Sequence, residues 1–209
     1  MAKLYFNYST MNAGKTTVLL QAAHNYSERG MNPFLLTANA DTRSGIGTIK
    51  SRIGLKKSAQ TFSQSVDLLN KVKEANSKKS ISCVFVDEAQ FLTEQQVWQL
   101  AKVVDDLKIP VLCFGLRVDF QGNLFPGSKC LLSIADELKE VKTICHCGKK
   151  ATMVIRQLNG KTVIDGDQVQ IGGNESYTSL CRKHWLNEFE KAIKFNKPLS
   201  KPRKSDVRV

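Results

Sequence analysis

Short apolar runs alternate along the first two thirds of the chain with longer segments whose apolar residues recur at helical spacing. Four apolar runs predict strands: residues 4–8, 33–38, 82–87 and 110–115. Three helically spaced segments predict helices: residues 16–29, 62–75 and 93–107. Thr93 and Gln96 form a capping box at the start of the third helix. Strands that alternate with helices predict an α/β fold with a right-handed parallel sheet.

The pattern changes near residue 140, where cysteines, turns and short alternating runs precede a helix near 180–195. We therefore expect an α/β domain over 1–140, a small second unit over 141–195, and a basic, disordered tail over 196–209. Residues 39–58 carry three glycines and five Lys or Arg residues. We expect this segment to be a mobile, cation-bearing loop.

The stretch YSTMNAGKTT, residues 8–17, has the second half of the phosphate-loop pattern G-x-x-x-x-G-K-[ST]. Ser9 stands where the first glycine is expected. A strand before the loop and a helix after it would aim backbone N–H groups at a phosphate. The alternative is an ordinary strand–turn–helix with a chance G-K-T. The predicted loop residues are Ser9, Thr10, Met11, Asn12, Ala13, Gly14, Lys15 and Thr16.

In such a loop Lys15 reaches the β- and γ-phosphates, and the Thr16 hydroxyl binds Mg²⁺. The apolar strand at 82–87 ends in Asp87 and Glu88, where a carboxylate on the Mg²⁺ side is expected. The alternative for these two acids is a solvated strand end. Together the motifs predict Mg²⁺–ATP binding, with the second motif contributing Asp87, Glu88, Ala89 and Gln90.

Two classes of ATP-using protein fit these motifs. In a small P-loop ATPase acting on nucleic acid, Glu88 would orient water. In a kinase, Glu88 would accept the proton of an attacking hydroxyl. A helicase core needs a second motor domain, for which 209 residues leave no room. We therefore favour the kinase and keep the ATPase as the alternative.

Six cysteines are present, and three of them form a spaced set with a histidine. The pattern is C-x-C, 33 intervening residues and C-x₂-H, which suits a closed tetrahedral structural zinc site. The predicted ligands are Cys145, Cys147, Cys181 and His184. His146 is a rival ligand, and free thiols are the alternative for the whole set. Cys83, Cys113 and Cys130 fit the free-thiol interpretation.

Between the two ligand pairs lies a glycine-rich segment over 159–175. With its ends held near a metal, this segment could fold over a ligand, because glycines let backbone groups approach closely. A tight hairpin is the alternative.

The net charge is +12, and the last 19 residues contribute +6 of it. Because the tail holds so much of the charge, we expect no polynucleotide partner. No run approaches the ~18 apolar residues of a membrane span, and the first residues do not form a signal peptide. We expect a cytoplasmic protein without a membrane partner.

These motifs together resemble the thymidine kinase family. The resemblance rests on residues 9–16, VDEAQF at 86–91, GLRVDF at 115–120, the zinc set and IGGNESYTSLC at 171–181, and it runs from about residue 3 to 190. The chain is most similar to the bacterial branch of the zinc-containing class, which also has Ser in the loop and C-x-C in the zinc set. The resemblance implies a P-loop parallel sheet with flanking helices (a RecA-like core) and a small zinc-binding lasso domain over the nucleoside.

The resemblance also implies transfer of the ATP γ-phosphate to the 5′-hydroxyl of thymidine, and less well of deoxyuridine. Glu88 would be the general base. The implied nucleoside-side residues are Met11, Asp41, Arg43, Phe91, Leu116, Phe120, Gln168, Gln170, Ile171, Gly172, Gly173 and Tyr177. For Phe91 and Phe120 an ordinary core role is the alternative. A homotetramer and feedback inhibition by dTTP are implied as well.

Overall fold

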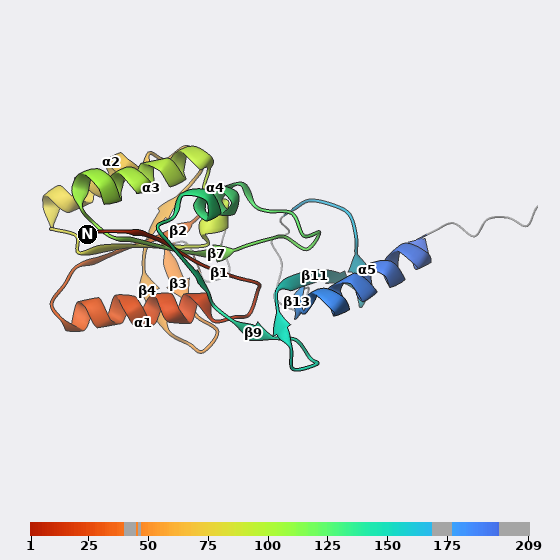
Figure 1. Cartoon of the computed structure of the whole chain (residues 1–209). Helices are drawn as coiled ribbons and strands as arrows, with labels where there is room; N and C mark the ends of the chain where they lie inside the picture. The colour runs from red at the N-terminus through yellow and green to blue at the C-terminus, as the bar shows by residue number, and fades with distance from the viewer. Residues whose placement is uncertain (40–44, 46, 169–176, 197–209) are drawn as a thin grey trace, which may run out of the picture.

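The computed structural model describes residues 1–39, 45, 47–168 and 177–196. Its centre is a sheet that lies between layers of helices (Figure 1). The sheet has six strands in the order β5-β2-β6-β7-β1-β8, with every neighbouring pair parallel. The strands are β1 (Leu4–Ser9), β2 (Pro33–Ala38), β5 (Gln60–Phe62), β6 (Cys83–Asp87), β7 (Val111–Leu116) and β8 (Glu137–Glu140). The predicted α/β fold with a parallel sheet is therefore confirmed.

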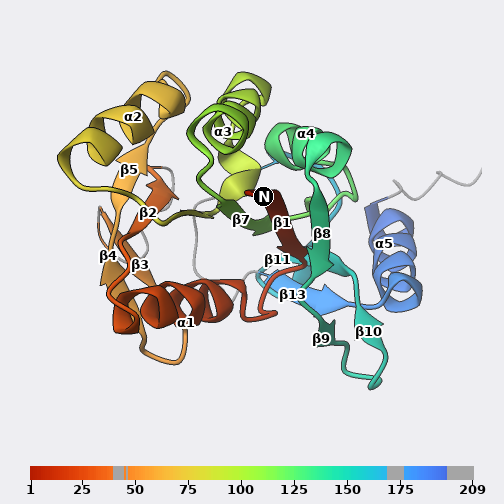
Figure 2. The same ribbon diagram turned by 60° about the vertical axis from the view of Figure 1, so that its left-hand side comes forward.

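Helices cover both faces of this sheet. One face carries α1 (Lys15–Glu28), and the other carries α2 (Leu68–Lys78), α3 (Glu94–Leu107) and α4 (Pro126–Ile134), as Figure 2 shows. Each face has its own buried apolar cluster, and the larger cluster lies under α2, α3 and α4. Every residue of β6 is buried, as a strand covered on both faces requires.

The capping box predicted for the third helix is present. The Thr93 hydroxyl accepts from the Gln96 N–H at 3.1 Å, and the Gln96 side chain accepts from the Thr93 N–H at 3.1 Å. The same Gln96 amide donates to the carbonyls of Ser63 and Val66. This one side chain therefore starts α3 and also fixes the loop in front of α2.

Two predicted elements differ from the structure. The helix predicted over 62–75 begins only at Leu68, after Asp67, whose carboxylate accepts from the Asn70 N–H at 3.0 Å. Phe62 instead ends β5, because its ring is buried against the core. The predicted loop over 39–58 contains an antiparallel pair, β3 (Thr48–Lys50) and β4 (Lys56–Ser58). Ile49 in β3 is 2% exposed and packs into the cluster at α1, which holds the β3–β4 pair against the core.

Beyond the sheet, the chain forms smaller elements: β9 (Thr143–Ile144), β10 (Lys150–Ala151), β11 (Met153–Leu158), β12 (Lys161–Val163), β13 (Tyr177–Leu180) and α5 (Arg182–Asn196). Strand β11 pairs antiparallel with both β12 and β13. Five buried residues form the apolar cluster here, and Trp185 and Phe189 pack against it. A core this small calls for additional stabilisation.

Hydrogen bonds connect these smaller elements to the loop between β1 and α1. The Thr10 hydroxyl donates to the Met153 carbonyl at 3.0 Å, and the Ser179 hydroxyl donates to the Met11 carbonyl at 2.6 Å. The Arg117 guanidinium donates to the Thr152 carbonyl at 3.1 Å.

Within the described ranges, no helix has the length and apolar character needed to cross a membrane.

Candidate active site

The predicted phosphate loop joins β1 to the first turn of α1, at the carboxyl ends of the parallel strands. Gly14 has φ +85° and serves as the N-cap of α1. A β-carbon is strongly disfavoured in this left-handed conformation, which explains the glycine. The start of α1 leaves unsatisfied N–H groups that can bind an anion.

Ser9, in contrast, does not need to be glycine. It ends β1 and is not among the residues with positive φ, so its side chain costs no left-handed strain. Its hydroxyl accepts from the Lys15 ammonium at 2.9 Å, and Lys15 also donates to the Thr10 carbonyl at 3.0 Å. The serine thus gives the lysine a polar partner inside the loop.

Asp87 ends β6 beside this loop and is 4% exposed. The Thr16 hydroxyl donates to its carboxylate at 3.2 Å. Burial and, second, the nearby Glu88 charge raise the pKa of Asp87 to about 7, although the Glu88 N–H, Lys15 and Thr16 oppose the shift. The predicted Mg²⁺ residues Thr16 and Asp87 are therefore in direct contact, in a site that disfavours an uncompensated negative charge.

The raised pKa makes a prediction about stability without ligands. Ionising Asp87 costs more in the folded than in the unfolded chain, so the penalty is absent below the ordinary carboxyl pKa, grows with pH, and is complete above about 7. We expect Asp87→Asn to raise the free energy of unfolding by up to a few kcal/mol at about pH 8. The gain should disappear near pH 4. Urea unfolding at several pH values measures it, with the exposed Asp106→Asn as the matched control. A gain that is independent of pH would contradict the assignment.

Glu88 follows Asp87 and has a left-handed backbone, with φ 53° and ψ 40°, ahead of the short helix η1 (Ala89–Phe91). This conformation is unusual for glutamate and often marks a functional position. The Gln90 side chain, 2% exposed, donates to the Glu88 carboxylate, and its oxygen accepts from the Leu116 N–H at 3.0 Å. Gln90 therefore links Glu88 to the end of β7.

Two glycines allow this turn to pack closely. A β-carbon at Gly115 would lie 2.9 Å from the Gln90 nitrogen, and one at Gly127 would lie 2.7 Å from the carbonyls of Ala89 and Leu92. Both positions thus require the absence of a side chain. Strand β7 and helix α4 can therefore hold the turn that carries Glu88.

Cys145, Cys147, Cys181 and His184 are brought together, with their ligand atoms all within 4.8 Å of one another. The Cys147 and Cys181 sulfurs are 3.9 Å apart, and His184 Nδ1 lies 3.3 and 3.5 Å from the sulfurs of Cys145 and Cys181. Zn–S bonds of ~2.3 Å at tetrahedral angles place sulfurs ~3.8 Å apart. The cluster can therefore hold a metal ion such as zinc.

The chemistry of the cluster agrees with its geometry. Burial opposes ionisation of Cys145, but N–H donors of Cys147 and Cys181 and the His184 ring lower its pKa to about 6. A thiolate is the form that binds metal. His146, the rival ligand, is not in the cluster, and its ring stacks on that of His184 with centroids 4.3 Å apart.

The predicted nucleoside-side residues come from several elements of the structure. Phe120 is 1% exposed, and Phe91 packs edge-on to Phe125 with centroids 6.4 Å apart. Gln168 donates to the Asp119 carboxylate at 2.9 Å, next to Phe120. Tyr177 begins β13. Asp41, Arg43, Gln170, Ile171, Gly172 and Gly173 lie outside the described residues.

The sequence interpretation missed several residues that organise this region. Asp119 accepts from the N–H groups of Gln121 and Asn123 at 2.9 and 2.8 Å and closes a tight turn. The sequence DFQGN, residues 119–123, is a turn signal that could have identified it. Arg156, in MVIRQL, is the one charged residue in a mostly apolar strand and could have been singled out in the same way.

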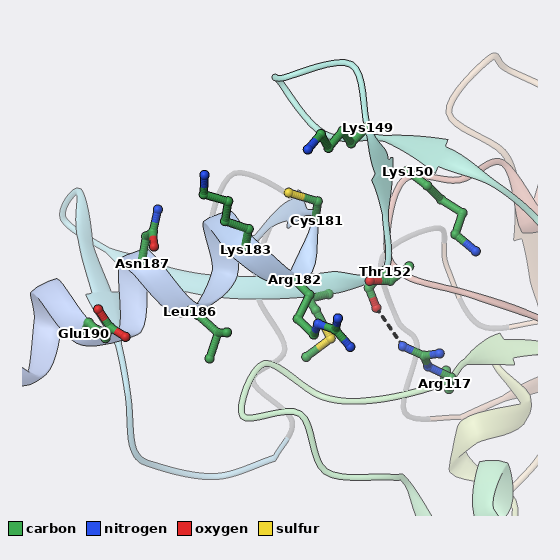
Figure 3. A pocket seen from close by; sticks show the side chains of 11 residues that line it. Arg117, Lys149, Lys150, Thr152, Cys181, Arg182, Lys183, Leu186, Asn187 and Glu190 are labelled. Carbon is green, nitrogen blue, oxygen red and sulfur yellow. Dashed lines mark hydrogen bonds between the residues drawn. The ribbon is translucent and has the colours of Figure 1, made fainter.

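A basic cleft of about 720 Å³ lies beside the metal cluster, between α5 and the Arg117 segment. Figure 3 shows its cations on three segments, at Arg117, at Lys149 and Lys150, and at Arg182 and Lys183. None of the residues predicted to bind phosphate or nucleoside lines it. The cations that line this cleft are therefore distinct from the residues predicted to bind phosphate.

Comparison with known proteins identifies the family. The family model for thymidine kinase matches residues 2–185. The chain is 63% identical over 186 residues to the thymidine kinase of Ruegeria pomeroyi, covering 88% of this chain and 94% of the relative. It is 61% identical over 186 residues to that of a Jannaschia species, covering 88% and 95%. It is 58% identical over 190 residues to that of Agrobacterium fabrum, covering 90% and 98%.

Among solved structures, the Pif1 helicase from Candida albicans aligns with 68% of this chain and 36% of its own. The TM-score is 0.41 at 14% identity, which is too low to support an argument about function.

Proposed function

Because this chain belongs to the thymidine kinase family, we propose that it transfers the γ-phosphate of ATP to the 5′-hydroxyl of thymidine, giving dTMP and ADP. The observation that carries the proposal is the convergence of Lys15, the Thr16–Asp87 pair and Glu88 at one edge of the sheet. The nucleic-acid ATPase is not favoured, since every curated relative named above is a thymidine kinase over nearly its full length.

We assign the donor phosphates to residues 9–16 and to the 87–90 segment. Lys15 neutralises the β- and γ-phosphates, while the N–H groups at the start of α1 bind their oxygens. The Thr16 hydroxyl and the Asp87 carboxylate would hold Mg²⁺, which would offset the charge that builds up during transfer. Lys15 favours the ionised form of Asp87 despite its burial, and a bound Mg²⁺ would favour that form further.

Glu88 is the proposed general base. Its carboxylate takes the proton of the 5′-hydroxyl as that oxygen attacks the γ-phosphorus in line, and ADP leaves from the opposite side. Gln90 orients the carboxylate through its amide, and its own orientation is fixed by the Leu116 N–H. The Glu88 side chain therefore needs little rearrangement before proton transfer.

We divide the chain into residues 1–140 for the donor, 141–195 for the nucleoside and zinc, and 196–209 as a basic tail. The proposed zinc ligands are Cys145, Cys147, Cys181 and His184. The nucleoside contacts we propose are those on described residues, Met11, Phe91, Leu116, Phe120, Gln168 and Tyr177, together with Asp41, Arg43, Gln170, Ile171, Gly172 and Gly173 outside them. A homotetramer and inhibition by dTTP are further proposals that rest on the family.

The direct test is product analysis after mixing the protein with Mg²⁺–ATP and thymidine, beside a vessel with single-stranded DNA in place of thymidine. We expect dTMP and ADP in equal amounts from the first vessel and stable ATP in the second. ATP hydrolysis only with DNA, and no dTMP, would overturn the proposal in favour of the ATPase.

The acceptor range gives a second prediction. The base of deoxycytidine presents a different hydrogen-bonding edge, and a polar group left buried and unpaired costs ~1–3 kcal/mol. Deoxyuridine lacks only the 5-methyl group of thymidine, which costs ~1 kcal/mol. We therefore expect deoxyuridine to be phosphorylated less efficiently than thymidine, and deoxycytidine much less than either. Comparing kcat/KM for the three nucleosides measures this order, and equal values for thymidine and deoxycytidine would contradict it.

A further inference from the structure

Arg156 is a buried cation at the centre of the small sheet. It lies in β11, is 5% exposed, and its register partners are Tyr177 on β13 and Val163 on β12. Residues directly opposite in antiparallel strands point to the same face. The Arg156 side chain is therefore a neighbour of Tyr177, one of the proposed nucleoside contacts.

The guanidinium connects two further segments. Its carbon lies 4.0 Å from the centroid of the Phe120 ring, a cation–π contact. Its two terminal nitrogens donate to the backbone carbonyls of Asp167 at 2.7 Å and Asp165 at 3.2 Å. One planar group thus fixes the Phe120 ring relative to the 165–167 backbone, which leads directly into Gln168.

Neighbouring contacts join the same two segments. The Gln168 amide donates to the Asp119 carboxylate at 2.9 Å, and the Gln121 amide donates to the Ile164 carbonyl at 3.3 Å. Gly166 lies against the guanidinium, since a β-carbon there would be 2.7 Å from an Arg156 terminal nitrogen. The arginine therefore occupies a space that its surroundings leave open for it.

Among the described residues, no ion pair explains the charge of Arg156. None of the carboxylates in the described part of the chain forms a salt bridge with it, and its Nε has no hydrogen-bond partner. A buried cation without an anionic partner reduces stability. An apolar side chain of similar volume would stabilise the folded chain more than this arginine does, which favours a functional reason for the arginine.

We propose that Arg156 is the positioning residue for the nucleoside. It acts through Phe120, Gln168 and Tyr177 and holds the three in one arrangement before thymidine binds. The proposal rests on the proposed function. Lysine cannot replace it, because one ammonium cannot stack flat on the ring and also bind two carbonyls in a fork.

The test compares Arg156→Lys and Gly166→Ala with the wild-type protein. We expect both to raise the KM for thymidine, Arg156→Lys by about 10- to 100-fold, with little change in kcat or in the KM for ATP. Gly160→Ala is the matched control, because Gly160 also has positive φ but its β-carbon would contact nothing within 4 Å. That variant should keep the wild-type KM for thymidine.

A spectroscopic readout separates positioning from general destabilisation. The Trp185 indole donates to the Phe120 carbonyl at 3.0 Å and to the Val154 carbonyl of β11 at 3.1 Å, so its fluorescence reports movement of the Phe120 turn relative to the strand that carries Arg156. In a Trp98→Phe background, both variants should alter Trp185 emission without thymidine, and Gly160→Ala should not.

Wild-type KM for thymidine in both variants, or equal increases in the KM for thymidine and for ATP, would overturn the positioning role. If the wild-type protein forms no dTMP, the proposed function fails, and the positioning role fails with it. If Arg156→Lys does not fold, Gly166→Ala still decides between the outcomes.

Discussion

Glu88→Gln is expected to lower kcat for dTMP formation by about 10²- to 10⁴-fold, the usual contribution of a general base. The amide keeps the shape of the side chain, and its oxygen can still accept from the Gln90 amide, but it cannot accept the 5′-hydroxyl proton. Because residues 9–16 and Asp87 are unchanged, the affinity for Mg²⁺–ATP should stay close to that of the wild type.

Single-turnover kinetics and a separate ATP-binding titration measure the two effects. Glu94→Gln is the matched control, since Glu94 is exposed at the start of α3, and it should retain full activity. If Glu88→Gln kept more than about a tenth of the rate, proton transfer by Glu88 would contribute less than a general base does. Equal losses of rate and of ATP affinity would instead indicate a role in donor binding.

Loss of the metal is expected to have the second large effect. Structural zinc sites contribute ~10–16 kcal/mol of binding free energy to small domains at pH 7, and the apolar cluster beside this site has only five buried residues among those the structure describes. We expect His184→Ala to lose zinc, to unfold the region from β9 to α5 at a lower temperature, and to abolish thymidine phosphorylation. The six-stranded sheet has its own clusters and should still bind ATP.

His146→Ala is the control for this experiment, because it removes the neighbouring imidazole, which stacks on His184 but is outside the cluster. It should keep one zinc per chain and most of the activity. Metal analysis, thermal unfolding and ATP titration of both variants distinguish the outcomes. Zinc retained by His184→Ala but lost from His146→Ala would show that the rival histidine is the ligand.

The elements that the sequence predicted well are those with a local cause. Thr93 and Gln96 cap α3 within four residues, and the apolar run before Asp87 is buried on both faces wherever a sheet forms around it. The helix over 62–75 was placed too early because the burial of Phe62 depends on its pairing with β2, which no local pattern reveals. The β3–β4 pair was missed for a similar reason, since only the packing of Ile49 under α1 distinguishes it from a loop.

The residues of the candidate site likewise fall into those that the sequence could identify and those that only the fold reveals. Lys15, Thr16 and the four candidate metal ligands are recognisable because their chemistry favours set spacings along the chain, and Asp87 is recognisable because it ends an apolar strand. Arg156 and Asp119 carry no such spacing, since their partners lie on segments that only the fold brings together. Contacts between distant backbone groups and buried side chains are therefore what the sequence alone left undetermined.

Two hydrogen bonds join the predicted phosphate loop to the strands that carry Tyr177 and Arg156. They run from Thr10 to the Met153 carbonyl and from Ser179 to the Met11 carbonyl. A ligand that stiffens one side thereby lowers the entropy that the other side still has to lose. We therefore expect occupancy of the two proposed substrate sites to be thermodynamically linked. By reciprocity, the factor by which bound ATP raises the affinity for thymidine equals the factor by which bound thymidine raises the affinity for ATP, whichever substrate binds first.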